Sequence, residues 1–170
     1  MSNNSVQLND ARLVTIRPIR PSDLDALRTF FTALSRATLR LRFHSSTNEL
    51  SEHLLNEFTR VNHAHVAFVA EIHGVAGQLP ALVAEARFVR NADSESAEFA
   101  LVVADNWRRI GLGTLLTRIL AQRARFTGVR HLCGDVLEDN KAMRGFAHSL
   151  GARLSRAIGR GQTLRLSMNV

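Results

Sequence analysis

The sequence predicts a mixed α/β domain whose central sheet of six to seven strands is mostly antiparallel and flanked by helices. Three observations support this fold class. A strand-like segment precedes helical periodicities in the first 60 residues, three strand-like segments with short connections then run from His65 to Asp105, and strand and helix alternate through the rest of the chain. The last of these observations includes a strand–helix–strand crossover, so one layered domain is expected.

The N-terminal third is expected to contain one strand and three helices. In residues 12–19, RLVTIRPI, one set of side chains (Leu13, Thr15 and Arg17) alternates with another (Val14, Ile16 and Pro18), and the proline ends the pattern. Such alternation is typical of a strand. Residues 21–35 carry apolar side chains at helical spacing, with Ser22 as the expected N-cap. Residues 37–43 and 46–60 indicate two further helices.

The remaining residues are expected to form five strands and two helices. Gly-, Asn- and Asp-containing loops at 73–78 and 91–94 predict antiparallel hairpins. Both helical segments end at glycine, which is typical of a helix C-terminus. The strand-like segments are 65–72, 79–90, 95–105, 129–137 and 161–169, and the helical ones are 111–128 and 139–151.

Length and composition fit a single domain in a reducing compartment. The 170 residues are 45% hydrophobic, and the polar first ten predict a flexible tail, which leaves one domain over 11–170. The N-terminus lacks the regions of a signal peptide, and no apolar run approaches the about 20 residues needed to cross a bilayer. Cys133 is the only cysteine, so no disulfide framework is predicted. A cytoplasmic protein without a membrane partner is expected.

The formal net charge of +7 favours an anionic partner. The basic residues are nearly all arginine, with Lys141 the only lysine, and they are spread along the chain. Nucleic-acid-binding proteins often concentrate such charge in a tail or patch. A solvated face with a few anion contacts is therefore favoured, and no nucleic-acid partner is predicted.

Residues 106–120, NWRRIGLGTLLTRIL, place two arginines before a glycine pair and an apolar helical repeat. A turn that leads into a helix leaves backbone N–H groups without partners, and the helix dipole favours an anion beside them. Gly111 and Gly113 lack the Cβ atoms that would keep a phosphate away, and Arg108 and Arg109 add positive charge. The turn is therefore expected to bind a pyrophosphate.

Three phosphate-binding patterns differ in what they require of this turn. The dinucleotide pattern G-x-G-x-x-G needs a third glycine where Leu116 stands. The triphosphate loop needs a Gly-Lys pair, which the sequence lacks. The pattern [QR]-x-x-G-x-[GA] is matched by Arg108, Gly111 and Gly113, although glycine turns of this kind also occur for purely geometric reasons.

With this last pattern the sequence resembles the GCN5-related N-acetyltransferases (GNAT), in which the motif holds the pyrophosphate of acetyl-coenzyme A (acetyl-CoA). The resemblance covers residues 12–170. SAEFALVVADNWRRIGLGTLL resembles the family's fourth strand and turn, VLEDNKAM with SLGARL resembles the segment after its fifth strand, and LSRATLRLRFHSS is similar to bacterial Pat-type protein-lysine acetyltransferases. The resemblance implies acetyl-CoA as co-substrate and no metal.

The resemblance also implies a splayed strand pair with the pantetheine arm between the two strands. Backbone groups around Val102 and Val103 would bond the pantetheine amides, as an open strand edge allows. Asn140 matches an asparagine that touches the coenzyme arm, although it could equally be the N-cap of the next helix. The residues implied to hold the pyrophosphate are Arg108, Arg109, Ile110, Gly111, Leu112, Gly113 and Thr114.

Acetyl transfer needs a base, because an amine with a pKa of about 10.4 is protonated at pH 7. Glu98 is the first candidate: it lies in the apolar segment AEFALVV, where burial would make it a better proton acceptor, and the glutamate of this motif is taken as the base in Pat-like enzymes. A structural glutamate on the polar face of a strand is the alternative. Glu85, in VAEARF, could lie across from Glu98 and share its role.

Other candidate residues have more open assignments. The family's tyrosine, which protonates the departing thiolate, is matched by Ala147 beside His148, and water or no acid is favoured for this step. His63 and His65 have no further ligand close by in sequence, so no metal site is predicted. Trp107 is expected either to stack on an adenine or to shield the turn. The basic side chains of Arg40, Arg42 and His44 are expected either to meet an acidic substrate or to remain solvated.

The resulting hypothesis is an acetyl-CoA-dependent N-acetyltransferase that acts by direct attack of a primary amine, with a protein lysine as the favoured acceptor. A small-molecule amine acetyltransferase is one alternative. A catalytically silent sensor of acyl-CoA is another, which the absence of tyrosine permits. A homodimer is compatible with the sequence, and no sequence feature decides it.

Overall fold

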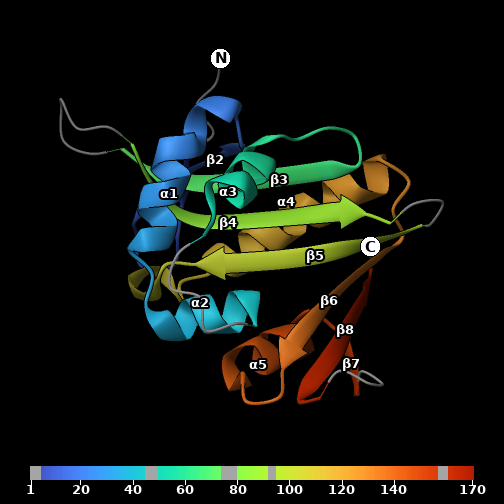
Figure 1. Ribbon diagram of the computed structural model, residues 1–170. Helices are drawn as coiled ribbons and strands as arrows, with labels where there is room; N and C mark the ends of the chain where they lie inside the picture. Colours follow the sequence, from blue (N-terminus) through green and yellow to red (C-terminus); the bar gives the residue numbers. More distant parts are fainter. Residues whose placement is uncertain (1–4, 45–49, 74–79, 92–94, 157–160) are drawn as a thin grey trace.

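The computed structural model describes residues 5–44, 50–73, 80–91, 95–156 and 161–170. Within these residues, eight strands form one sheet in the order β1-β2-β3-β4-β5-β6-β8-β7 (Figure 1). The strands are β1 (Ser5–Gln7), β2 (Leu13–Pro18), β3 (His65–Ile72), β4 (Ala81–Arg90), β5 (Ser96–Val103), β6 (His131–Leu137), β7 (Arg153–Arg156) and β8 (Thr163–Asn169). Two of them, β1 and β7, were not predicted from the sequence.

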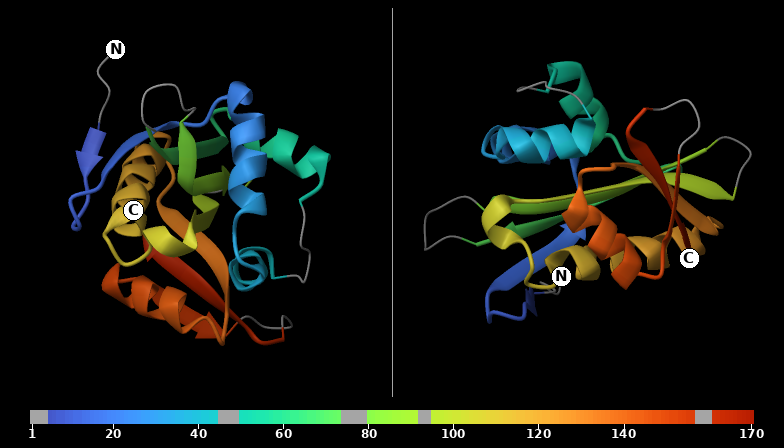
Figure 2. Two further views of the ribbon diagram at one scale, coloured as in Figure 1. Left: turned by 90° about the vertical axis from the view of Figure 1, so that its left-hand side faces the viewer. Right: turned by 90° about the horizontal axis from the view of Figure 1, so that it is seen from below.

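Helices cover both faces of this sheet. Seen along the sheet in the right-hand view of Figure 2, α1 to α3 lie on one side and α4 and α5 on the other. Because β4 is covered on both faces, seven consecutive residues of it are buried. The helices are α1 (Leu24–Thr32), α2 (Arg36–Phe43), α3 (Glu52–Thr59), α4 (Leu112–Phe126) and α5 (Lys141–Ser149), with short 3₁₀ helices η1 (Pro21–Asp23) and η2 (Asp105–Trp107).

All adjacent strand pairs are antiparallel except β5 and β6, so the predicted mostly antiparallel sheet is confirmed. The hairpin loops predicted at 73–78 and 91–94 lie mostly outside the described residues, as do residues 46–49 of the third predicted helix. The described bounds of α3, Glu52–Thr59, fall within that prediction. None of the described helices has the length and apolar composition needed to span a bilayer.

The described N-terminal residues differ from the predicted flexible tail over 1–10. Residues 5–7 form β1 on β2, and Leu8 is buried in the core. The N–H of Asn9 donates to the carbonyl of Ile110 at 3.3 Å, so this segment supports the glycine turn. Three strand residues are too few to show a period in the sequence, and their pairing depends on a partner that lies further along the chain.

The strands β5 and β6 pair only over their first three residues, Ser96–His131 to Glu98–Cys133, and then diverge (Figure 1). Gly134 lies just beyond the last pair, and a Cβ built on it would be 2.8 Å from the carbonyl oxygen of Phe99. A side chain at this position would therefore force the two strands apart. The predicted splayed pair is present in the described sheet.

We expect Gly134→Ala to lower the free energy of unfolding by about 1–3 kcal/mol, because the backbone oxygen of Phe99 cannot move without shifting β5. Urea denaturation of purified protein measures this change. Gly145→Ala is the matched control: Gly145 lies in α5 with no atom within 4 Å of a built Cβ, so stability should rise by up to about 1 kcal/mol. Equal stability of Gly134→Ala and wild type would contradict the tight contact.

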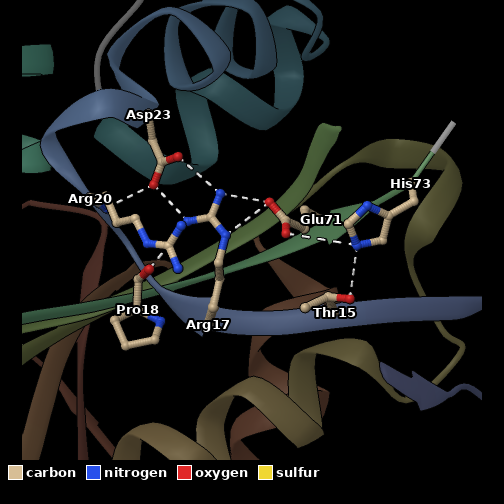
Figure 3. Close-up of polar contacts among 7 residues, drawn as sticks. All are labelled: Thr15, Arg17, Pro18, Arg20, Asp23, Glu71 and His73. Carbon is tan, nitrogen blue, oxygen red and sulfur yellow. Dashed lines mark hydrogen bonds and ion pairs between the residues drawn. The ribbon is translucent and has the colours of Figure 1, made fainter. Parts of the chain in front are cut away.

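A polar network joins β2 and β3 to the start of α1 (Figure 3). The guanidinium of Arg17 binds both carboxylate oxygens of Asp23 at 2.7 and 2.9 Å and Oε2 of Glu71 at 2.6 Å. Asp23 also accepts the backbone N–H of Arg20 at 2.7 Å. The predicted N-cap Ser22 is wrong, because Ser22 lies inside η1 and α1 begins after Asp23.

Candidate active site

A cavity of about 820 Å³ lies where β5 and β6 separate. Its walls come from α2, β4, β5, β6, α5 and the turn that precedes α4. We call residues 108–114 the signature turn. Glu98 is five residues before Val103 on β5, and at 3.3 Å per residue the two are about 16 Å apart. The cavity therefore extends along β5 from the signature turn to Glu98.

The signature turn presents unpaired backbone N–H groups at the start of α4. Arg109 and Gly111 have positive φ of 62° and 88°, which turns successive peptide groups toward one side. The N–H groups of residues 109–114 donate no hydrogen bond to any described residue, and no side chain caps α4. This arrangement has the geometry that suits an anion, as expected from the sequence.

The side chains of the signature turn divide into two groups. Arg108, Arg109, Gly111, Gly113 and Thr114 line the cavity. Ile110 and Leu112 pack into the core beneath the turn. Only backbone groups of these two residues could therefore meet a ligand, while their side chains fix the turn to the sheet.

Arg108 connects the signature turn to α2. Its Nε donates to the carbonyl of Val103 at 3.2 Å, and its Nη2 donates to the hydroxyl of Thr38 and lies 3.2 Å from Asp105. Asp105 in turn accepts hydrogen bonds from Ser35, the N-cap of α2. Arg108 therefore positions α2 over the cavity and has less freedom to follow a ligand than expected from the sequence.

Every second residue of β5 directs its backbone N–H and C=O groups toward the separated β6. The N–H of Ala104 donates to the carbonyl of Val83 on β4. Along an antiparallel ladder, the backbone groups of Val102 then also face β4, while those of Leu101 and Val103 face the separated β6. The carbonyl of Phe99, close to Gly134, follows the same alternation. Val103 is thus placed to bond a ligand, whereas the backbone of Val102, also implied to do so, is committed to the sheet.

Glu98 lines the cavity but is not buried as predicted. Its side chain is 47% exposed and forms a bidentate ion pair with Arg165, with one distance of 3.0 Å. Arg165 also binds Asp135 at 3.0 Å, and its pKa is raised, chiefly by the hydrogen bond to Glu98. Arg165 was missed in the sequence, where Leu164, Leu166 and Met168 alternate with it and indicate only that it faces away from them.

Residues 29–152 match the model of the acetyltransferase (GNAT) family. The chain belongs to the GNAT family. Acetyltransferase PA5475 of Pseudomonas aeruginosa is 34% identical over 145 residues, which are 85% of this chain and 77% of that protein. Acetyltransferase Pat of Mycolicibacterium smegmatis is 32% identical over 149 residues, 86% of this chain but 43% of Pat, so the chain spans less than half of that relative.

Solved structures confirm the GNAT fold. The GNAT domain of S. lividans PAT superimposes with a TM-score of 0.87 at 24% identity, over 98% of this chain and 96% of that chain. YncA, a putative acetyltransferase from Salmonella typhimurium solved with acetyl-CoA, gives a TM-score of 0.71 at 20% identity, over 92% and 93% of the two chains. The predicted family and fold are therefore confirmed.

Glu85 does not neighbour Glu98 in this GNAT sheet, so the two carboxylates are not the cross-strand pair that the sequence left open. Glu85 lies opposite Val102, and Glu98 lies opposite Val89, four residues further along β4. Glu85 is fully buried and its Oε1 accepts a hydrogen bond from Nε of Arg87 at 2.5 Å. Its role is to hold Arg87.

The helix α5 supplies a cap and an apolar wall. Oδ1 of Asn140 accepts the N–H of Met143 at 3.0 Å, which confirms the N-cap assignment, and Asn140 also lines the cavity. Ala147, at the family's tyrosine position, is buried, and His148 is exposed away from the cavity lining. Phe146 supplies an aromatic ring from α5 to the cavity wall.

The structure also shows the surroundings of Trp107 and of the basic residues 40, 42 and 44. The guanidinium of Arg12 lies 4.0 Å above the ring of Trp107, so one face of that ring is covered. Arg40 forms an ion pair with Asp139 at 2.8 Å outside the cavity lining, whereas Arg42 and His44 line the cavity. Burial, together with the nearby Arg42 and Arg40, lowers the pKa of His44 against the opposing effect of Asp135.

His65 is held neutral by its neighbour. Its Nε2 is 3.0 Å from Nη1 of Arg87, and because a guanidinium only donates, Nε2 must be the acceptor. Burial and the charge of Arg87 lower the pKa of His65. An unfolded chain, whose histidines have a pKa near 6.5, therefore binds more protons than the folded chain as the pH falls below that value.

We expect the free energy of unfolding to decrease as the pH is lowered from 7.5 to 5.5, because protonation of His65 favours the unfolded chain. Urea denaturation across this range measures the dependence. In His65→Gln the side-chain carbonyl still accepts from Arg87 but does not titrate, so the dependence should be shallower, with His44 contributing to what is left. An identical pH dependence in the variant would show that His65 does not titrate differently on folding.

Proposed function

We propose that this GNAT protein transfers an acetyl group from acetyl-CoA to a primary amine by direct attack, with Glu98 as the base. One observation carries the proposal: a single cavity joins an uncapped helix N-terminus, an unpaired strand edge and a carboxylate. These three features suit an anion, an amide-containing arm and an amine, in that order along β5.

The residues present fit acetyl-CoA. The unpartnered N–H groups of residues 109–114, with Arg109 beside them, would hold the pyrophosphate. The backbone groups of Leu101 and Val103 would bond the pantetheine amides. Val102, Asn140 and Phe146 would contribute cavity wall rather than backbone hydrogen bonds. When bound, acetyl-CoA supplies an activated thioester carbonyl.

Glu98 would prepare the acceptor for attack. It accepts one proton from the ammonium, directly or through a water, so that the nitrogen lone pair forms the new C–N bond while the C–S bond breaks. The second proton that the nitrogen loses goes to the departing thiolate or to solvent. Arg165 holds the carboxylate in place with its two N–H groups. The chain has no tyrosine to protonate the departing sulfur, and a thiol with a pKa of about 8.5 departs without one.

The acceptor class is tested with a cell extract separated into macromolecules and metabolites. Each fraction is incubated with purified protein and acetyl-CoA, and released thiol is measured. We expect release with macromolecules, as for a protein-lysine acceptor. Release only with metabolites would indicate a small-molecule amine acetyltransferase. Silence in both, with acetyl-CoA bound, would contradict the enzyme proposal and favour an acyl-CoA sensor.

A further inference from the structure

Two basic side chains, Arg42 and Arg87, also line the cavity, and Glu85 and His65 bind Arg87 outside the cavity lining. We call Arg42, His65, Glu85 and Arg87 the arginine cluster. Arg87 lies opposite Ala100 on β5, two residues from Glu98, so Arg87 and Glu98 share one face of the sheet as diagonal neighbours. Arg42 reaches the same place from α2, and both arginines line the cavity.

Hydrogen bonds fix two of the three guanidinium nitrogens of Arg87, and the third has no hydrogen-bond partner among the described residues. Arg87 is 4% exposed, its Nε and Nη1 bind Glu85 and His65, and its guanidinium stacks 3.6 Å from the ring of Phe58. Its Nη2 is buried and has no hydrogen-bond partner among the described residues. A preorganised guanidinium with an unsatisfied N–H donor is a good partner for an anion.

Arg42 forms no ion pair within 4.0 Å with any described residue. Its guanidinium lies 4.9 Å from the ring of Phe43 and 5.9 Å from that of Phe58, and its Nε is buried without a hydrogen bond. Burial lowers the pKa of Arg42 to about 10, with the positive charge of Arg87 acting in the same direction and Glu85 against it. Such a site favours a ligand that brings a negative charge.

The charges of the cavity separate into two parts. The arginine cluster has two guanidinium groups and one carboxylate, because Arg42 and Arg87 face Glu85. Glu85 also has a buried oxygen without a partner, Oε2, but Glu85 does not line the cavity. On the other side, the carboxylates of Glu98 and Asp135 both bind Arg165. One part of the cavity wall thus presents two guanidinium groups and the other presents the carboxylate of Glu98, which suits a ligand with a carboxylate and an ammonium group.

We propose that Arg42 and Arg87 bind a carboxylate of the acceptor, while its amine lies at Glu98. Preferred acceptors are then amines with a carboxylate close to the reacting nitrogen. This inference rests on the proposed acetyltransferase function. The carboxylate belongs either to a free amino acid or to an acidic residue beside a lysine in a polypeptide, and both present the same chemistry to the two arginines.

Matched acceptor pairs test the proposal through kcat/KM. Leucine against leucinamide, and Nα-acetyl-lysine against its amide, test a free amino-acid carboxylate. A peptide with Lys-Glu against one with Lys-Gln tests an acidic side chain. We expect the carboxylate member of one pair to be favoured about tenfold to a hundredfold. Arg42→Gln should abolish that preference, because it lowers kcat/KM for the carboxylate member to near the value for the neutral member.

Two further variants separate binding from folding. Arg40→Gln removes an equivalent charge from the same helix, but Arg40 is outside the cavity lining, so the preference should stay as in wild type. Arg42→Lys keeps the charge without the two-pronged geometry and should retain an intermediate preference. A preference that survives in Arg42→Gln, or a wild type without preference in any pair, overturns the proposal.

Thermal unfolding with the N-acetylated form of each compound gives a readout that needs no turnover. The N-acetylated compounds that carry the carboxylate should raise the midpoint temperature of thermal unfolding of wild type and of Arg40→Gln, but not that of Arg42→Gln. If no compound is acetylated yet this pattern holds, the enzyme proposal fails and the carboxylate site stands. If acetylation occurs and no carboxylate shifts the midpoint, the enzyme proposal stands and the carboxylate site fails.

Discussion

Glu98→Gln is expected to lower kcat/KM for amine acetylation by about 10²–10⁴-fold, because an amide cannot accept the proton of the attacking ammonium. The substituted amide keeps the size of the side chain and one acceptor oxygen for Arg165. Steady-state assays of thiol release measure the loss. Acetyl-CoA affinity, measured by calorimetry, should be unchanged because the signature turn lies beyond Val103, which is itself about 16 Å from Glu98 along β5.

Glu95→Gln is the matched control for this experiment. Glu95 directly precedes β5 and forms an exposed ion pair with Arg130 at 3.0 Å, outside the cavity lining. Its replacement should leave kcat/KM unchanged. If Glu98→Gln turned over as fast as wild type while still binding acetyl-CoA, Glu98 would not be the base, and the role would pass to a water or to His44, which also lines the cavity.

The signature turn could be predicted from the sequence because its function depends on local chemistry. Adjacent residues supply the glycines, the positive φ angles and the start of α4, so a short pattern contains nearly all of the site. The alternation of hydrogen bonding along β5 could not be predicted to the residue. It depends on the register with β4, which assigns the free edge to Leu101 and Val103.

The surroundings of Glu98 could not be predicted, because they come from distant strands. Arg165 is 67 residues away in sequence and reaches Glu98 only because β8 pairs with β6. The apolar residues around Glu98 indicated burial, but β5 and β6 separate just beyond it and leave its side chain in an open cavity. The register also decides that Glu85 contacts Arg87 and not Glu98.

The network around Arg17 places three charged groups in a mostly buried site. The side chains of Asp23 and Glu71 are each 8% exposed, and Arg17 is the group that neutralises both. Burial alone would raise the pKa of Asp23, but the hydrogen bonds from Arg17 and from the backbone of Arg20, together with the charges of both arginines, outweigh it and the pKa is lowered. Asp23 therefore contributes stability above its unfolded pKa of 3.8, and this contribution is lost as the pH falls through its lower folded value.

We expect Arg17→Met to lower the free energy of unfolding by about 3–5 kcal/mol, because it removes the guanidinium that two buried carboxylates share. Urea denaturation at pH 7 measures this loss. The same change at Arg28, whose ion pairs with Asp25 and Glu52 are exposed, should alter stability far less. Since protonation neutralises the orphaned carboxylates, the deficit of Arg17→Met should shrink as the pH is lowered toward 4. A deficit equal to that of Arg28→Met would mean that water solvates Asp23 and Glu71 as well as Arg17 does.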